Sequence, residues 1–107
     1  MTKITDIYIH INSHNAQALE NIFQDKQLKN KINWQENQYI KVLNNVLTRC
    51  VEVHARDCLP IILGLKDFDE IDKSIYADAL DIAIRNYLAN PVDNNFYFVD
   101  QIITKTR

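Results

Sequence analysis

Glycine is nearly absent from this 107-residue chain, in which Gly64 is the single example. Loops that hold nucleotide phosphates need several closely spaced glycines, because their backbone N–H groups must approach the phosphate closely. One glycine excludes a loop of this kind. We therefore expect no nucleotide and no other cofactor.

An excess of positive charge is also missing. The 12 Lys and Arg residues are outnumbered by 14 Asp and Glu residues, the formal net charge is −2, and the basic residues form no stripe. Because nucleic-acid-binding surfaces are normally basic, we expect no nucleic acid partner.

Long apolar runs are absent as well. None approaches the roughly 18 residues of a membrane-spanning helix. The amino-terminal MTKITDIYIHINSHN has no apolar core followed by a small-residue cleavage site, as a signal peptide would. We expect a cytoplasmic protein with no membrane partner, whose 2 cysteines stay reduced. A secreted effector with a non-cleaved signal would share these features.

The rest of the composition is that of a folded protein. Apolar residues make up 47% of the chain and charged residues 24%, which is enough apolar surface to form a core. A length of 107 residues fits one domain, which we place at 1–107.

The strongest helical pattern lies at 34–53. Apolar side chains recur there at three- and four-residue steps, as at Val46 and Cys50. The NWQE that opens this segment predicts that Asn33 caps the helix and that Glu36 reaches back to the cap. A second long helix is expected at about 73–87.

The start and end of the second helix are marked by its flanking residues. Asp72 or Ser74 can cap its start. Pro91 disfavours helical backbone at the residue before it, so the helix should end before NPVDNN.

The terminal segments fit two structures. Ile7, Ile9 and Ile11 alternate as in a strand, but the spacing within 4–11 also fits a helix. We favour a helix, because SHNAQALENIF follows directly and predicts a second helix capped by Asn15. The tail NNFYFVDQIITKTR fits a helix or an edge strand in the same way.

Three residues with metal-binding side chains, Cys50, His54 and Cys58, recur every four residues. On one unbroken helix they would lie on a single face and could hold a metal ion. They supply at most three ligands, and their spacing matches no familiar zinc pattern. We expect no metal, and a small metal-binding regulator or enzyme using these residues is an alternative.

Pro60 argues against the unbroken helix. A proline inside a helix loses a backbone hydrogen bond, and its ring collides with the carbonyl four residues earlier, at a cost of about 3 kcal/mol. If a new helix begins with Asp57 as its cap, Pro60 falls in the first turn, where proline is tolerated. We therefore expect a break around 54–56, with Cys50 and Cys58 buried on two antiparallel helices.

The segment KDFDEID at 66–72, which we call the acidic segment, contains four carboxylates. One interpretation is a solvated loop that caps the next helix. The other is a surface that attracts a basic protein partner. The candidate partner-binding residues are Asp67, Phe68, Asp69, Glu70 and Asp72. Phe68 would be the central apolar anchor, unless it turns into the core.

Three segments share the order of a first helix, a short polar turn and a second helix. They begin at Ile7, Leu47 and Leu80, so their starts are 40 and 33 residues apart. The piece LDIAIRN at 80–86, together with the apolar positions of the other two segments, resembles the ankyrin repeat, whose period is 33 residues.

The ankyrin resemblance implies binding to a protein partner and not catalysis. It places the turn glycine of that family at His14, His54 and Tyr87, which must then adopt a conformation that glycine adopts more easily. We expect an all-α fold of about six helices in three stacked antiparallel hairpins, as an ankyrin-like solenoid or a small bundle. An α+β fold with terminal strands is the alternative.

The expected function is that of a protein-binding module. No Ser/His/Asp set and no informative pair of carboxylates is recognisable, so we expect a protein that is not an enzyme. An immunity-type or inhibitory protein that covers a basic partner with the acidic segment fits these features. A further hypothesis is a structural protein that self-associates.

Overall fold

The computed structural model describes residues 2–31 and 38–107. These residues form six α-helices and no strand. The α-helices are α1 (Ile4–Asn12), α2 (Ala16–Ile22), α3 (Tyr39–Glu52), α4 (Leu59–Leu63), α5 (Ala77–Ala89) and α6 (Asp93–Thr106). They are connected in part by the short 3-10 helices η2 (Arg56–Cys58), η3 (Lys66–Glu70) and η4 (Lys73–Tyr76). Within the described ranges no helix is long and apolar enough to cross a membrane.

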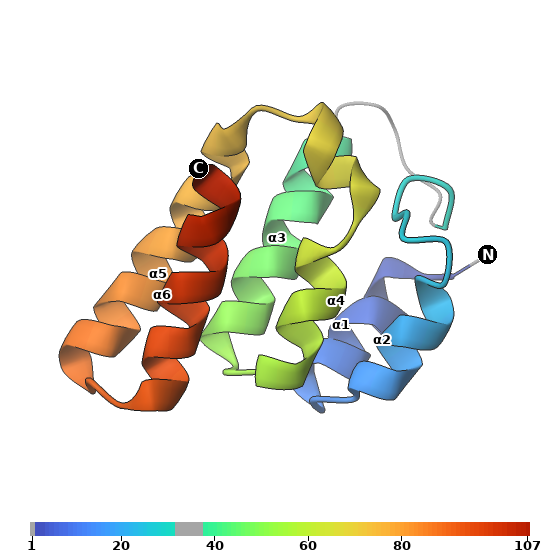
Figure 1. Cartoon of the computed structure of the whole chain (residues 1–107). Helices are drawn as coiled ribbons and strands as arrows, with labels where there is room; N and C mark the ends of the chain where they lie inside the picture. Colours follow the sequence, from blue (N-terminus) through green and yellow to red (C-terminus); the bar gives the residue numbers. More distant parts are fainter. Residues whose placement is uncertain (1, 32–37) are drawn as a thin grey trace.

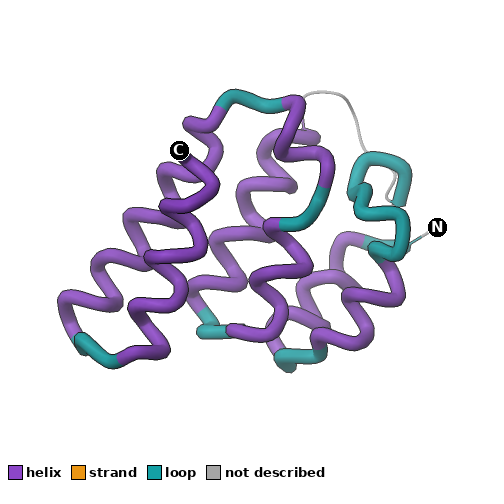
Figure 2. Tube along the Cα trace, in the orientation of Figure 1, coloured by secondary structure: helices purple, strands orange, loops and turns teal. Residues whose placement is uncertain are grey.

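The α-helices pair into three antiparallel hairpins, α1–α2, α3–α4 and α5–α6, which stack side by side (Figure 1). Helix α3 contacts α1 on one side and α5 on the other, so the middle hairpin is covered on both sides. Figure 2 shows the turns within the hairpins at one edge of the stack and the connections between hairpins at the opposite edge. The predicted all-α stack of three hairpins is confirmed.

Both terminal segments are helical, so the alternative with terminal strands is wrong. In α1, Ile7 and Ile11 are fully buried, whereas Ile9 is 58% exposed. A strand would place these three alternate residues on one face, but a helix separates the middle one from the other two. In α6, Phe98 and Ile102 are buried in the same helical pattern.

Helix α3 carries the predicted apolar stripe, and Val46 and Cys50 on it are fully buried. It begins at Tyr39. The predicted cap, Asn33, and its partner Glu36 lie outside the described residues.

The chain reverses at His54, as Pro60 predicts. Helix α3 ends at Glu52, and His54 adopts the left-handed backbone conformation with a φ of 56°. The N–H of Ala55 then donates to the carbonyl of Cys50 as the chain turns back. Pro60 lies in the first turn of α4, where a missing N–H costs no hydrogen bond within the helix.

The turn of the first hairpin has the same geometry 40 residues earlier. His14 also has a φ of 56°, and the N–H of Asn15 donates to the carbonyl of His10. The spacing predicted between the segments that begin at Ile7 and Leu47 is therefore also the spacing of their turns.

The two hairpins differ in how their second helix begins. The side chain of Asn15 accepts the N–H of Ala18 and caps α2, as predicted. Ala55 holds the equivalent position and has no side-chain acceptor, and here the chain passes through η2 before α4. The prediction that Asp57 caps α4 is wrong, because Asp57 lies within η2 and no side chain caps α4.

The third hairpin departs from the predicted repeat. Asp72 caps η4 by accepting the N–H of Ser74 at 2.8 Å, as predicted for one of the two candidate caps. Helix α5 continues to Ala89 and ends before Pro91, as expected. Tyr87 therefore lies inside α5, and the predicted turn at Tyr87 is wrong.

One continuous apolar core joins all six α-helices. Three polar side chains are buried with it among the described residues, Thr48, Asp67 and Asn95. The Asn95 amide donates to the carbonyls of Asn86 and Asn90, at 3.2 and 2.8 Å, and so fixes the turn between α5 and α6. Buried polar groups are costly unless they are hydrogen-bonded, and in the described part of the chain every buried side-chain N or O atom has a partner.

Candidate functional site

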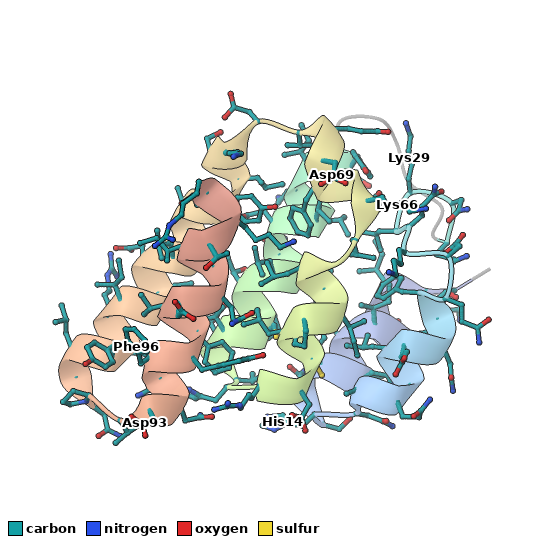
Figure 3. All side chains as sticks on the ribbon, viewed as in Figure 1. His14, Lys29, Lys66, Asp69, Asp93 and Phe96 are labelled. Carbon is teal, nitrogen blue, oxygen red and sulfur yellow. The ribbon has the colours of Figure 1, made fainter. Side chains whose placement is uncertain are left out.

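The acidic segment is the first candidate for a partner surface. It lies at the edge of the stack where the hairpins are connected (Figure 3). Its five predicted residues are placed in two different environments. Asp69, Glu70 and Asp72 are exposed, whereas Asp67 and Phe68 are each only 4% exposed.

Asp67 stabilises the fold. One carboxylate oxygen accepts the backbone N–H of Leu28 at 2.8 Å, and the other accepts the N–H of Lys29 at 3.1 Å and the hydroxyl of Tyr39. Burial and the neighbouring Asp67 carboxylate raise the pKa of Tyr39 above its ordinary value. Asp67 thus holds the chain after α2 against η3, and the structure removes it from the partner surface.

Phe68 belongs to the core. Its ring stacks on that of Tyr76, with the centroids 5.2 Å apart and the planes inclined by 24°. The prediction that Phe68 is an exposed anchor for a partner is therefore corrected, and the other prediction, that it turns inward, describes its position.

The exposed part of the acidic segment stands among basic side chains. Lys29, Lys66 and Glu70 line the same small depression, and Figure 3 shows Lys29, Lys66 and Asp69 at this edge of the molecule. Because the lysines partly offset the carboxylates, the negative potential here is weaker than the acidic segment alone implies.

The predicted metal-binding residues are not assembled into a site. Cys50 and Cys58 are buried, and the Cys50 thiol donates to the carbonyl of Ala55 at 3.2 Å. His54 is exposed, with its ring edge-on to Phe98 at a centroid distance of 6.3 Å. Across residues 2–31 and 38–107 no group of three His, Cys, Asp or Glu side chains could hold a metal ion.

The buried thiols also differ from those of catalytic cysteines. Burial raises the pKa of Cys50, and the neighbouring Cys58 raises it further. Burial and the charge of Asp57 raise the pKa of Cys58. Nucleophilic cysteines need a lowered thiol pKa and access to solvent, so neither thiol is suited to that role.

The outer surface of the last hairpin is strongly apolar, and the sequence interpretation missed it. We call this surface the end face, and it consists of the exposed apolar residues Ile84, Leu88, Val92, Phe96 and Ile103. Leu88 is 74% exposed and Phe96 is 50% exposed. These five are most of the large apolar side chains exposed in the described part of the chain, and the others are Ile9 and Ile40.

Helical spacing gathers the end face into one patch. Ile84 and Leu88 are four residues apart on α5, and Phe96 and Ile103 are seven apart on α6, so each pair lies on one side of its helix. The ring of Phe96 packs edge-on against Tyr87, with centroids 5.7 Å apart, and joins the two rows. Figure 3 shows Phe96 at the α5–α6 hairpin, at the end of the stack opposite α1 and α2.

The charged neighbours of the end face balance one another. Asp81 and Arg85 form an ion pair at 2.6 Å on α5, one turn from Ile84 and Leu88. Asp100 and Arg107 are exposed on α6, at helical spacing from Ile103. The edge of the end face therefore carries two residues of each sign.

The opposite end of the stack is polar. Apart from Ile9, the exposed residues of α1 and α2 are Thr5, Asp6, Asn12, Gln17, Glu20 and Asn21. Helical stacks need a polar outer surface on each terminal unit to stay soluble. The first hairpin has such a surface and the last hairpin does not.

An open groove of about 570 Å³ runs between α2 and α4. Its described lining contains two charged side chains, Glu20 and Lys26, beside amides and the apolar Ile61. No nucleophile with an adjacent base lines it, so it supports no reaction that we can derive.

Comparison with known proteins identifies no relative: no family model matches the chain, and neither curated proteins nor solved structures include a match. The surfaces described above therefore carry the functional argument on their own.

Proposed function

We propose that this chain is a non-enzymatic protein-binding module that binds a protein partner through the end face. The observation that carries the proposal is the uncovered apolar patch on α5 and α6, centred on Leu88 and Phe96. Contiguous apolar patches on an otherwise polar protein mark interaction surfaces. An aromatic residue such as Phe96 is typical of the buried centre of an interface.

The form of the end face favours a protein partner. It is a broad surface built on two rigid helices, whereas small-molecule sites are concave and enclose their ligand. Within the stack, the corresponding side of α3 is covered by α5. A partner that presents an apolar helical surface would cover the end face in the same way.

The acidic segment supports a second candidate surface. Its exposed residues Asp69 and Glu70 lie on the short helix that Asp67 and Phe68 fix to the body of the protein. A basic partner, as in an immunity-type or inhibitory complex, would be attracted to these carboxylates. The ankyrin resemblance agrees with a protein-binding function and stays a prediction.

Retention of a partner from an extract of the native cell tests the two surfaces against each other. We compare the unchanged protein with Leu88→Glu on the end face and with the double variant Asp69→Lys/Glu70→Lys. Burying a leucine contributes about 2 kcal/mol, so Leu88→Glu should reduce retention of a specific partner by about tenfold or more. Quantitative mass spectrometry of the retained proteins measures this.

The matched control is Ile9→Glu, which introduces the same charge at an exposed apolar residue of α1. It should retain the partner fully. If the double variant loses the partner and Leu88→Glu keeps it, the acidic segment is the binding surface instead. If no variant changes retention of any protein, both surfaces are rejected.

A further inference from the structure

We infer that the end face binds a second copy of this chain, giving a dimer in which the two end faces are in contact. This inference rests on the proposed function, because it names the partner of the same surface. Three features of the molecule support it, which are the chemistry of the two ends, the charges around the end face and the area available.

The two ends of the stack allow one arrangement of copies. An apolar surface is stabilised by contact with another apolar surface, and the described residues form one such patch, the end face. The exposed residues of α1 and α2 are polar except for Ile9. A head-to-tail contact would therefore bury polar groups against Leu88 and Phe96, whereas an end-to-end contact buries apolar groups on both sides.

The charges around the end face permit this contact. Asp81 and Arg85 on α5, with Asp100 and Arg107 on α6, give equal numbers of each sign. In a two-fold dimer the same patch meets itself, so a patch with one sign of charge would repel its copy. The end face avoids that repulsion, because each acidic residue at its edge can face a basic residue of the other copy.

The area of the end face sets the strength of the contact. Helices α5 and α6 contain 13 and 14 residues, so each is about 20 Å long. Two packed helices are together about 20 Å wide, which gives about 400 Å² from each copy and about 800 Å² in total. Stable interfaces bury at least about 1,200 Å². The dimer should therefore be weak and reversible, with a mass that depends on protein concentration.

Sedimentation equilibrium of the purified 107-residue chain tests the inference. The monomer mass is 12.6 kDa. Between about 10 µM and about 1 mM protein, the range where weak complexes form, the average mass should rise toward twice that value and not beyond it. A mass that stays at 12.6 kDa across this range overturns the inference, and so does a mass that grows past two copies.

Two variants locate the contact, and a third is the control. Leu88→Glu and Val92→Glu should each abolish the rise in mass, because each places a charge in the end face. Ile9→Glu should show the same rise as the unchanged protein, because α1 is not in the contact. Association that survives both end-face variants, or is lost in Ile9→Glu, contradicts an end-to-end dimer.

Folding is checked in the same samples by circular dichroism and urea unfolding. Leu88 is 74% exposed and Val92 is 45% exposed and lies outside the helices, so both variants should keep the helical signal. The result also separates this inference from the proposed function. If the unchanged protein is monomeric throughout but Leu88→Glu loses a retained cellular partner, the dimer is wrong and the protein-binding function stands.

Discussion

Single side chains in the acidic segment have opposite roles. Asp67 and Asp69 are two residues apart and have the same chemistry, but Asp67 is 4% exposed and hydrogen-bonded, whereas Asp69 is exposed. The difference comes from Leu28, whose N–H is bonded to Asp67 from 39 residues away. A contact at that separation leaves no pattern in the local sequence, so the sequence could not distinguish the structural carboxylate from the surface one.

The substitution Asp67→Asn should destabilise the protein by about 2 kcal/mol, because charge-assisted hydrogen bonds to a buried group contribute about that much. The amide keeps the shape of the side chain but loses the charge and one of the two acceptor oxygens. The measurement is the free energy of unfolding in urea. The matched control is Asp69→Asn, which should change stability by less than about 0.5 kcal/mol as a surface substitution. Equal effects of the two variants would show that Asp67 does not stabilise the fold.

Helices and turns were predicted best where the cause is local. Pro60 correctly predicted the break before α4, and Asn15 correctly predicted the start of α2, because both effects act within one turn of helix. The turn at Tyr87 was predicted from the spacing of the first two segments alone. Helix α5 instead continues to Ala89, where Pro91 and the buried Asn95 determine the reversal.

The hairpin turns place histidines in a conformation that glycine usually occupies. Both His14 and His54 have a φ of 56°. The only glycine, Gly64, has an ordinary φ of −79°. A residue with a side chain pays roughly 1–2 kcal/mol in the left-handed region.

Glycine should therefore be more stable than alanine at position 54. We expect His54→Gly to exceed His54→Ala by about 1 kcal/mol in the free energy of unfolding. The same pair of substitutions at the exposed α3 residue Arg49 should give the opposite order, because glycine inside a helix costs about 1 kcal/mol relative to alanine. Thermal or urea unfolding of the four variants decides this. The same order at both positions would mean that His54 is not strained.

The molecule as a whole was predicted in its architecture and not in its ends. Repeated helix–turn–helix patterns in the sequence were enough to predict three stacked hairpins. The end face was missed, because the apolar residues of 80–88 were interpreted as one buried stripe. Leu80, Ala83 and Tyr87 do face inward to different degrees, but Ile84 and Leu88 extend the apolar surface around to the far side of α5. A stripe that is too wide for one contact is the signal that could have revealed it.

Stability of the whole molecule should fall in alkaline solution. The pKa of the Cys50 thiol is raised by burial from its ordinary 9.0, and burial raises the pKa values of Cys58, Tyr8, Tyr39 and Tyr76 as well. Above pH 9 the unfolded chain releases the Cys50 proton while the folded protein keeps it, so the free energy of unfolding decreases as pH rises. The stabilisation is complete below pH 9.

Each such group adds a slope of at most about 1.4 kcal/mol per pH unit. Urea unfolding at pH 7, 9 and 10 measures the slope, and Cys50→Ala is the informative variant. It should lower stability at pH 7 through the cavity it leaves, but its stability should fall less between pH 9 and 10. An unchanged slope would show that Cys50 does not retain its proton in the folded state.

The polar surface of the first hairpin has a consequence for crowded solutions. A building block with adhesive surfaces at both ends would polymerise into fibres. Here Asp6, Gln17 and Glu20 leave the opposite end hydrated, so growth terminates as soon as the single adhesive end is occupied. The protein can therefore carry an exposed apolar surface at high concentration without forming filaments.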